Sequence, residues 1–422
     1  MPEFTLWPPV KYAGPYWRRE KLKELFPEEA NALDRYYRFY DRMIRLLSLA
    51  RRSESARGLS ALWLKIQMLL AFQPVKSMVK WNGGQLMDHY FKSPVLKTLF
   101  LGIVADFVTA PSEFPALGVP SLHLETAFDK RTPTYPGTRS AQTAYVYLRN
   151  GCQGLVDAVQ GVIESNHGNI VTGMAVKRIM IKDGYATGVE LTNGKIVNAD
   201  VILASGGMKE LFYDLVGKEK IPAELIEQIE GNRLMESVMM VQLGIDFDPT
   251  PYQPKALCYY YKTQDLEGSV RRLRTGVYHE GREGFLIYVP SMHSPSMAPK
   301  GRHAVTIYTV APDVLAEGSW SSRKEELADR LVECAEEHIP GLWAHTQTRL
   351  ILTPEDFRNR THLKHHSFGG MPPVMGNKPP AHETPIKNLW FIGAQSESTG
   401  GILNVMTGAY RVAKRIIQAN QK

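Results

Sequence analysis

The sequence predicts an α/β fold with α+β elements, in which helices are combined with two kinds of β-sheet. Two segments, 199–217 and 388–419, each contain a short apolar strand, a glycine turn and then a helix, the order found where helices cover a sheet. Between them, residues 237–318 contain alternating apolar and polar runs, which indicate an antiparallel sheet with one covered face. The first part of the chain has helical spacing instead.

The N-terminal part is expected to be mainly helical. The helical stretches are expected at 18–52, 59–72 and 86–108. Pro27 lies inside the first stretch, and we expect it to open a second helix, because proline is favoured in the first helical turn. Ser93 followed by Pro94 marks another helix start in the same way. The stretch 109–136 carries five prolines and predicts a loop or crossover.

A turn, a helix and a series of strands are expected next. Residues 151–161 read as a turn and a helix, and strands are expected at 170–174, 175–181, 185–191, 195–199 and 200–204. Asp183-Gly184 and Asn193-Gly194 are residue pairs typical of tight hairpin turns, so they should connect neighbouring strands. Residues 208–217 are expected to be helical.

The antiparallel sheet and the C-terminal elements complete the expected order. Strands are expected at 238–245, 256–261, 285–289, 304–310 and 389–392, and helices at 323–338 and 401–419. We therefore predict four segments: helical residues 1–145, a mixed strand-and-helix segment 146–236, a sheet segment 237–345 and a C-terminal strand-and-helix segment 346–422.

Composition and charge narrow the class of protein. Of the 422 residues, 44% are hydrophobic and 22% are charged, a balance that excludes wholesale disorder. The formal net charge is +7, and residues 35–97 alone contain twelve Lys and Arg against three acidic residues. Such a basic segment is either a solvated helix face or a surface that attracts an anionic membrane or a nucleic acid. We favour no nucleic-acid role.

Cysteine usage and hydropathy indicate the cellular compartment. The three cysteines, Cys152, Cys258 and Cys334, have no paired spacing, which argues against a disulfide framework and for a reducing compartment. The N-terminus lacks a basic-then-apolar signal pattern. The best candidate for a membrane span, 59–72, is interrupted by Lys65 and Gln67. We expect a cytoplasmic protein, soluble or peripheral on a membrane.

The C-terminal strand and helix form the first candidate binding motif. An apolar strand leads to Gly393, and Gly400 and Gly401 precede the last helix. Glycines let the backbone approach a ligand without a Cβ in the way, and a helix N-terminus offers free N–H groups and a partial positive charge. This arrangement suits a phosphate or the electron-rich edge of a flavin. Any α/β crossover shares the general pattern, so the motif alone leaves that alternative open.

The second candidate motif lies between residues 150 and 217. A Gly-x-x-Gly turn, Gly151 to Gly154, opens a helix, and a later apolar strand ends in Ala204-Ser205-Gly206. The strand end against a glycine turn would let the backbone approach a dinucleotide closely. The alternative is a strand-to-helix connection without a ligand.

With both motifs in place, the chain resembles the phytoene desaturase family of FAD-dependent oxidoreductases, which includes carotenoid isomerases and retinol saturases and is related to amine oxidases. The resemblance covers nearly the whole chain and is most specific at 151–217 and 384–417. It implies a two-dinucleotide-type FAD oxidoreductase fold. Segments 146–236 and 346–422 would belong to the FAD-binding domain, and segments 1–145 and 237–345 would form a mixed helical and antiparallel-sheet substrate domain. It also implies FAD as the cofactor, with these binding residues: Val176, Ala204, Ser205, Gly206, Gly393, Ala394, Gly400, Gly401, Ile402 and Val405.

The chain departs from the family pattern in two places. It contains no Gly-x-Gly-x-x-Gly, the motif that holds the dinucleotide pyrophosphate. We therefore expect an incomplete FAD-binding domain that begins roughly a hundred residues later in the family's order: the sequence is truncated, a partner chain supplies the missing half, or FAD is not bound. In addition, Glu397 stands where the family commonly has a histidine, and it is our catalytic candidate.

Two further groups of residues are less informative. His362, His365 and His366 fit no zinc spacing, so we expect no metal site. Tyr259, Tyr260 and Tyr261 are consecutive in an expected strand and either line a cavity or serve packing.

The resemblance implies a reaction class. It predicts desaturation, saturation or isomerisation at C–C or C=C bonds of an apolar isoprenoid or polyene-like substrate. One alternative is a non-autonomous or non-catalytic subunit that needs a partner chain with the dinucleotide-binding half. Another is an amine-oxidase-like flavoenzyme. The basic helices within 35–97 could dock on a membrane surface and admit a lipid-soluble substrate.

Overall fold

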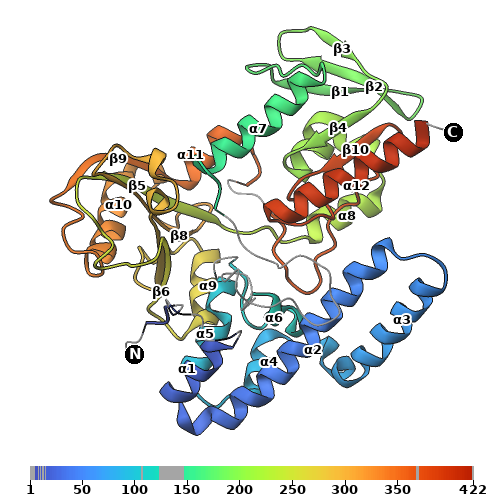
Figure 1. The fold of residues 1–422 in the computed structure, drawn as a ribbon. Helices are drawn as coiled ribbons and strands as arrows, with labels where there is room; N and C mark the ends of the chain where they lie inside the picture. Colours follow the sequence, from blue (N-terminus) through green and yellow to red (C-terminus); the bar gives the residue numbers. More distant parts are fainter. Residues whose placement is uncertain are drawn as a thin grey trace. The chain divides into compact units, whose positions relative to one another are not determined.

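The structure is a computed structural model, and it describes residues 5–7, 9, 11, 14, 16–105, 108–122, 147–366 and 370–420. The chain divides into two compact units (Figure 1). Unit 1 consists of residues 1–147 and 261–270, and unit 2 consists of residues 148–260 and 271–422.

Unit 1 is helical. Its α-helices are α1 (Trp17–Leu25), α2 (Ala30–Ser55), α3 (Gly58–Phe72), α4 (Gly83–Tyr90), α5 (Pro94–Ala105), the short α6 (Val119–Leu122) and the first part of α9 (Leu266–Arg274). Pro27 and Pro94 lie at the expected places: Pro27 opens the 3₁₀ turn Pro27–Glu29 before α2, and Pro94 is the first residue of α5. Both prolines therefore stand at the start of a helical segment, where their fixed φ angle is favoured.

The core of unit 1 is aromatic. The Tyr36 ring is fully buried and lies 4.7 Å from Phe100 and 5.5 Å from Phe91, centroid to centroid. Glu29 is also buried, and its Oε1 accepts hydrogen bonds from the backbone N–H groups of Lys92 and Ser93 at 2.7 and 2.6 Å. A buried carboxylate thus joins the start of α2 to the start of α5.

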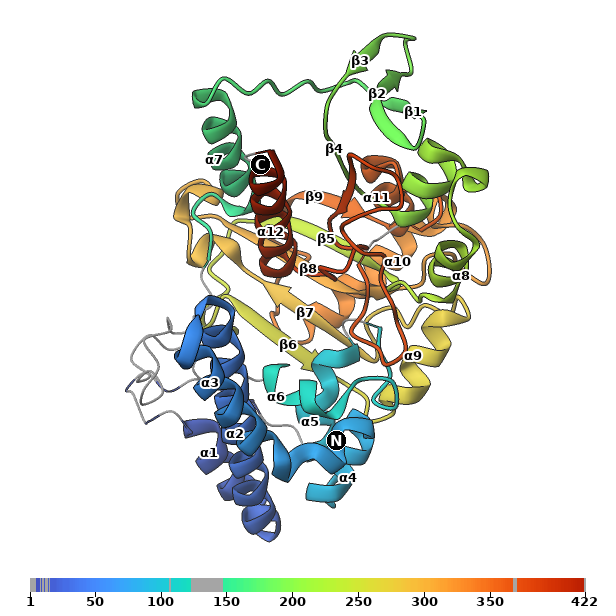
Figure 2. The same cartoon turned by 90° about the vertical axis from the view of Figure 1, so that its right-hand side faces the viewer.

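Unit 2 contains a five-stranded sheet in the order β6-β7-β8-β5-β9, whose central strands lie side by side in Figure 2. The strands are β5 (Ser237–Ile245), β6 (Leu257–Tyr261), β7 (Gly284–Tyr288), β8 (His303–Ala311) and β9 (Thr346–Leu352). The helix α10 (Trp320–Glu336) packs on this sheet, and Leu327 and Leu331 share one hydrophobic core with Val241 and Ile307. The predicted antiparallel sheet is therefore confirmed.

The rest of unit 2 holds two smaller sheets. The first has the order β1-β2-β3 and consists of β1 (Val176–Lys182), β2 (Tyr185–Leu191) and β3 (Ile196–Asn198). The second is parallel and consists of β4 (Ile202–Ser205) and β10 (Leu389–Ile392). The other helices of unit 2 include α7 (Gly151–Ser165), the π-helix Glu210–Gly217, α8 (Ala223–Gly231), α11 (Pro354–Thr361) and α12 (Ile402–Asn420).

One sequence expectation is wrong, one was only partly tested, and one strand was not expected. Residues 170–174 form no strand, because Gly173 has a φ of +69° that interrupts an extended chain. The expected loop 109–136 contains a 3₁₀ turn at Ala116–Gly118 and then α6, while its residues from 123 on lie outside the described residues. The strand β9 was not anticipated, and it joins the sheet beyond residue 345, where we expected the sheet segment to end. The bounds of the four predicted segments stay a prediction.

Candidate functional site

The two parallel strands of unit 2 bring the two sequence motifs together. Leu389 pairs with Ile202 and Ile392 with Ser205, so the carboxyl ends of β4 and β10 lie side by side. Each strand is followed by a glycine, Gly206 or Gly393. In α/β sheets, ligands bind at the carboxyl ends of the parallel strands. Residues almost 190 positions apart in sequence therefore form one candidate site.

Gly206 and Gly393 give this site its shape. Their φ angles are +120° and +101°, values that side chains disfavour. A Cβ on Gly393 would lie 3.7 Å from the Gly206 backbone nitrogen, whereas a Cβ on Gly206 would have no heavy atom of the described residues within 4 Å. Backbone is thus exposed where a side chain would otherwise stand, which fits the close approach of a flat or phosphorylated ligand.

The loop after Gly393 is held by hydrogen bonds on both sides. The Ala394 carbonyl accepts from Met371 N–H at 2.9 Å, and the buried Gln395 Oε1 accepts from Met208 N–H at 2.8 Å. The Ser396 hydroxyl donates to the Gly393 carbonyl at 2.7 Å. This bonding fixes the loop before any ligand binds, so the site is preorganised.

The loop ends at the N-terminus of α12. Gly401 has a φ of +107°, and its carbonyl accepts the bond from Val405 N–H at 3.0 Å. The N–H groups of the residues just before Val405, including Ile402, have no intrahelical acceptor by helix geometry. A Cβ on Gly400 would lie 3.6 Å from the Gly370 Cα, so this glycine also permits a close backbone approach. A helix of 19 residues with an exposed first turn is suited to bind an anion there.

Glu397 is exposed and lies in the same loop. Its Oε1 accepts from His382 N–H at 3.1 Å, while its own N–H donates to the Pro380 carbonyl at 2.8 Å. These bonds tie the loop to the strand-like segment that precedes β10. Its catalytic role stays a prediction.

His382 was missed by the sequence reasoning. Its buried ring places Nδ1 2.8 Å from the Phe391 carbonyl and Nε2 3.0 Å from Ser398 Oγ. Gly408 of α12 makes room for this contact, because a Cβ there would collide with Ser398 Oγ and lie 2.9 Å from His382 Nε2. A lone histidine two residues before Thr384-Pro385 carries no spacing signal, so only the fold reveals its role.

Two of the predicted cofactor residues stand apart from the loop. Val176 opens β1, in the three-stranded sheet rather than in the parallel pair. Val405 lies in the first turns of α12 and is half-buried. The structure thus brings together Ala204, Ser205, Gly206 and Gly393, and it connects them through Ala394 and the ordered loop to Gly400, Gly401 and Ile402.

The histidines and tyrosines have other surroundings. His365 Nε2 lies 3.5 Å from an oxygen of Asp214, and within the described ranges no cluster of three or more His, Cys, Asp or Glu side chains could hold a metal ion. The Tyr260 ring stacks on His338 at 4.2 Å and on Phe285 at 5.1 Å. Packing therefore accounts for Tyr260, and burial raises the pKa of its hydroxyl.

No family model matches the chain. Curated relatives do match. The chain is 23% identical to the mouse (Mus musculus) pyridine nucleotide-disulfide oxidoreductase domain-containing protein 2, over 91% of this chain and 72% of that protein. It is 24% identical to a lycopene-forming phytoene desaturase of Paracoccus sp., over 64% of this chain and 54% of the relative. A chloroplastic prolycopene isomerase of an Oncidium hybrid cultivar is 22% identical, over 64% of this chain and 46% of the relative. The chain therefore spans about half the length of these last two relatives.

Solved structures show the same fold. An oxidoreductase from Methanosarcina mazei superposes with a TM-score of 0.57 at 17% identity, over 83% of this chain and 72% of that chain. A putrescine oxidase variant superposes with a TM-score of 0.52 at 10% identity, over 93% of this chain and 76% of that chain. The expected oxidoreductase fold is confirmed by these likenesses.

Proposed function

Because its relatives support a phytoene desaturase-like family of FAD-dependent oxidoreductases for this chain, we propose that it forms the part of such an enzyme that holds the flavin and the substrate. The observation that carries the proposal is the pair of glycine turns at the ends of β4 and β10, followed by the N-terminus of α12. Open backbone beside a helix N-terminus fits a flavin with its phosphate chain.

The chain's own residues would hold and orient the flavin rather than react with it. Gly206 and Gly393 leave room for a flat ring system, and the first turn of α12 offers N–H groups to its O2 edge or phosphate. The bonds of Gln395 and Ser396 keep the loop in place. The bound flavin would supply hydride acceptance or donation at its ring.

The substrate we propose is an apolar isoprenoid or polyene whose C–C or C=C bonds are desaturated, saturated or isomerised. The support comes from relatives named phytoene desaturase and prolycopene isomerase. Hydride chemistry on such a substrate needs few acid–base groups. Glu397 is the candidate side chain on the substrate side of the flavin, where its bond to His382 would orient it.

A specific observation favours a second element that completes the site. Among the described residues β4 is an edge strand, and its Leu203 is 45% exposed. Parallel sheets are normally covered on both faces, and a two-stranded sheet is rarely stable alone. We propose that a dinucleotide-binding βαβ element carrying Gly-x-Gly-x-x-Gly pairs with the free edge of β4 and grips the pyrophosphate.

The test is the flavin content of the purified protein. The chain is expressed alone and, separately, with a co-expressed chain that carries Gly-x-Gly-x-x-Gly, and the absorbance spectrum of each purified product is recorded. We expect flavin bands only in the co-expressed complex, together with conversion of a C40 polyene and none of a diamine. Flavin in the chain alone would remove the need for a second element. No flavin in either product would overturn the proposed function.

A further inference from the structure

Helix α3 of unit 1 exposes an unusual amount of apolar surface. We define the α3 stripe as the six large side chains on one face of this helix: Leu59, Leu62, Trp63, Ile66, Leu69 and Leu70. Counted from Leu59, the others follow after three, four, seven, ten and eleven residues, which is the spacing of one helical face. Leu59 is 85% exposed, Trp63 59% and Leu70 66%.

The opposite side of α3 is already packed against other residues of unit 1. Leu64 is the buried side chain of this helix, and α3 packs beside α2, next to it in Figure 1. A helix that is apolar on both faces normally has both faces covered. Exposed apolar patches of this kind mark interaction sites, since water contact with six large side chains is unfavourable.

The charge around the stripe identifies the partner that would fit. From Ser55 to Met87 the sequence contains no acidic residue, while Arg57, Lys65, Lys76 and Lys80 are exposed. No ion pair joins these four cations to any other residue that the structure describes. Clustered cations beside an apolar face attract an anionic lipid surface, and a tryptophan such as Trp63 is favoured at the lipid–water boundary.

The length of α3 determines how it could meet a bilayer. Fifteen residues extend about 22 Å as a helix, less than the roughly 30 Å of a hydrocarbon core. In the described part of the chain, no helix is long and apolar enough to cross a membrane. Because α3 is shorter than the hydrocarbon core, it would lie in the plane of the interface.

We propose that α3 is an in-plane membrane anchor, which buries the α3 stripe in the acyl region of an anionic bilayer while the flanking cations contact the lipid headgroups. A second copy of the chain is a less suitable partner. A symmetric contact between two α3 stripes would bring two sets of these cations together, and residues 55–87 contain no carboxylate to neutralise them. The anchor does not depend on the flavin chemistry proposed above.

Flotation of the purified chain with vesicles tests the anchor. The test variant is Leu62→Ser, Ile66→Ser and Leu70→Ser in α3. The control variant is Val277→Ser, Val314→Ser and Leu350→Ser, which changes three exposed aliphatic residues of unit 2. We expect the parent and the control to float with vesicles that contain phosphatidylglycerol, and the α3 variant to partition at least about tenfold more weakly. Equal flotation of all three proteins, or no flotation of the parent, would overturn the proposal.

Two further measurements separate a membrane from other partners. Brominated lipid should quench part of the tryptophan fluorescence, and Trp63→Phe should remove that part while leaving flotation largely intact. Lys76→Gln with Lys80→Gln should weaken binding to anionic vesicles and reduce its dependence on salt. If light scattering instead finds a parent dimer that the α3 variant converts to a monomer, with quenching absent, the stripe is a self-association surface and the anchor is wrong.

Discussion

Gly393 connects β10 to the loop that leads to α12, and the candidate site depends on its backbone. Its φ of +101° disfavours any side chain, and a Cβ there would stand beside the Gly206 nitrogen and the Ser205 side chain. We predict that Gly393→Ala lowers the flavin content of the co-expressed complex and lowers the free energy of unfolding by about 1 kcal/mol or more. Urea unfolding and flavin absorbance would measure the two effects.

Gly161 offers the matched control for that change. It lies inside α7 without a positive φ, and a Cβ there would meet no heavy atom within 4 Å in the part of the chain that the structure describes. Gly161→Ala should therefore raise stability by about 0.5–1 kcal/mol and leave flavin content unchanged. If Gly393→Ala behaved like Gly161→Ala, the strand-end glycines would have no special role.

Gly408 gives a second prediction at this scale. A Cβ at this position would displace Ser398 from His382, which anchors the loop to β10 through the Phe391 carbonyl. We expect Gly408→Ala to loosen the loop 394–400 while leaving the five-stranded sheet intact. Hydrogen exchange would detect faster exchange at Ser398 N–H. Unchanged exchange throughout this loop would contradict the idea that His382 anchors it.

Sequence reasoning found the strand-end glycines but not the residues that hold the loop. Gly206, Gly393 and Gly401 follow apolar strands or precede a helix, so local order reveals them. His382 and Gly408 act only across the tertiary contact with Ser398. No local pattern specifies such a contact, because it depends on how α12 packs on β10.

At the scale of single elements, strands with an alternating pattern and a clear turn were predicted well. β2 and β10 have the predicted bounds, and Asp183 and Gly184 form the hairpin turn with φ angles of +51° and +80°. The failures have physical causes. Residues 170–174 are apolar, yet Gly173 breaks them and they have no partner strand in the described part of the chain. β9 begins with polar residues, so its alternation is weak, and it is stabilised by pairing with β5.

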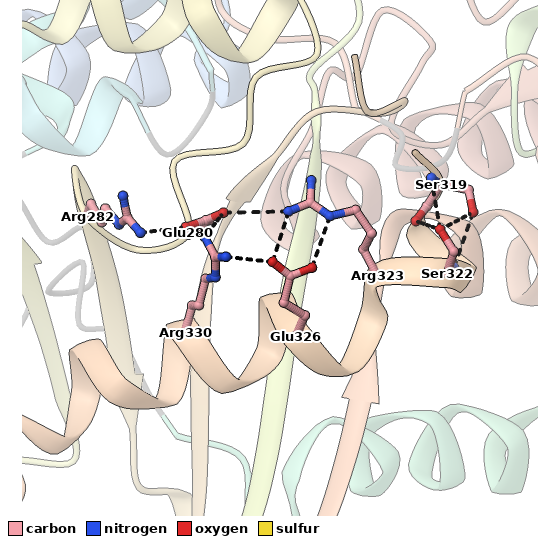
Figure 3. Close-up of polar contacts among 7 residues, drawn as sticks. All are labelled: Glu280, Arg282, Ser319, Ser322, Arg323, Glu326 and Arg330. Atoms are coloured by element: carbon pink, nitrogen blue, oxygen red, sulfur yellow. Dashed lines mark hydrogen bonds and ion pairs between the residues drawn. The ribbon is translucent and has the colours of Figure 1, made fainter. Parts of the chain in front are cut away.

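An ion-pair network joins α10 to the loop before β7 (Figure 3). Arg330 contacts both oxygens of Glu280 at 2.8 and 2.7 Å and reaches Glu326 at 2.6 Å, while Arg323 donates to Glu326 at 3.2 Å. The hydrogen bonds from Arg323 and the positive charge of both arginines hold the pKa of Glu326 below its ordinary value of 4.5. Ser319 and Ser322 cap the start of the same helix.

The network predicts a pH dependence of stability. Because the folded-state pKa of Glu326 is lowered, its contribution is fully present above about pH 4.5 and is lost as the pH falls through the lower value. Glu326→Gln should therefore lower the free energy of unfolding at pH 7, and lower it less at pH 3. Urea unfolding at both pH values would measure this. Glu325→Gln is the control on the same helix. The Glu325 side chain is 74% exposed and its nearest ion-pair distance, to Arg349, is a long 3.8 Å, so its removal should change stability less. An equal loss from Glu326→Gln at both pH values would contradict the assignment.

At the scale of the whole molecule, the exposed apolar surfaces of unit 2 are where the proposed dinucleotide-binding element would pack. No residue of α7 is buried, and Val156, Val159 and Ile163 form an exposed stripe along it. On α12, Val412 is buried, whereas Leu403, Met406, Tyr410 and Ile417 are between 51% and 69% exposed on another face. Together with the free edge of β4, these faces match what a dinucleotide-binding βαβ element would cover.

The face of α12 that carries Leu403, Met406 and Tyr410 provides the last prediction. If a βαβ element covers this face, Leu403→Ser with Met406→Ser and Tyr410→Ser should abolish co-purification of the partner chain and of flavin. The same variant should leave vesicle flotation unchanged, because α3 belongs to unit 1. The α3 variant should do the reverse, so each serves as the control for the other. Affinity co-purification, flavin absorbance and flotation would be measured on both proteins. Since three exposed apolar side chains are removed from α12, the isolated chain should also aggregate less than the parent. Retention of partner and flavin by the α12 variant would show that this face is not where the dinucleotide-binding element packs.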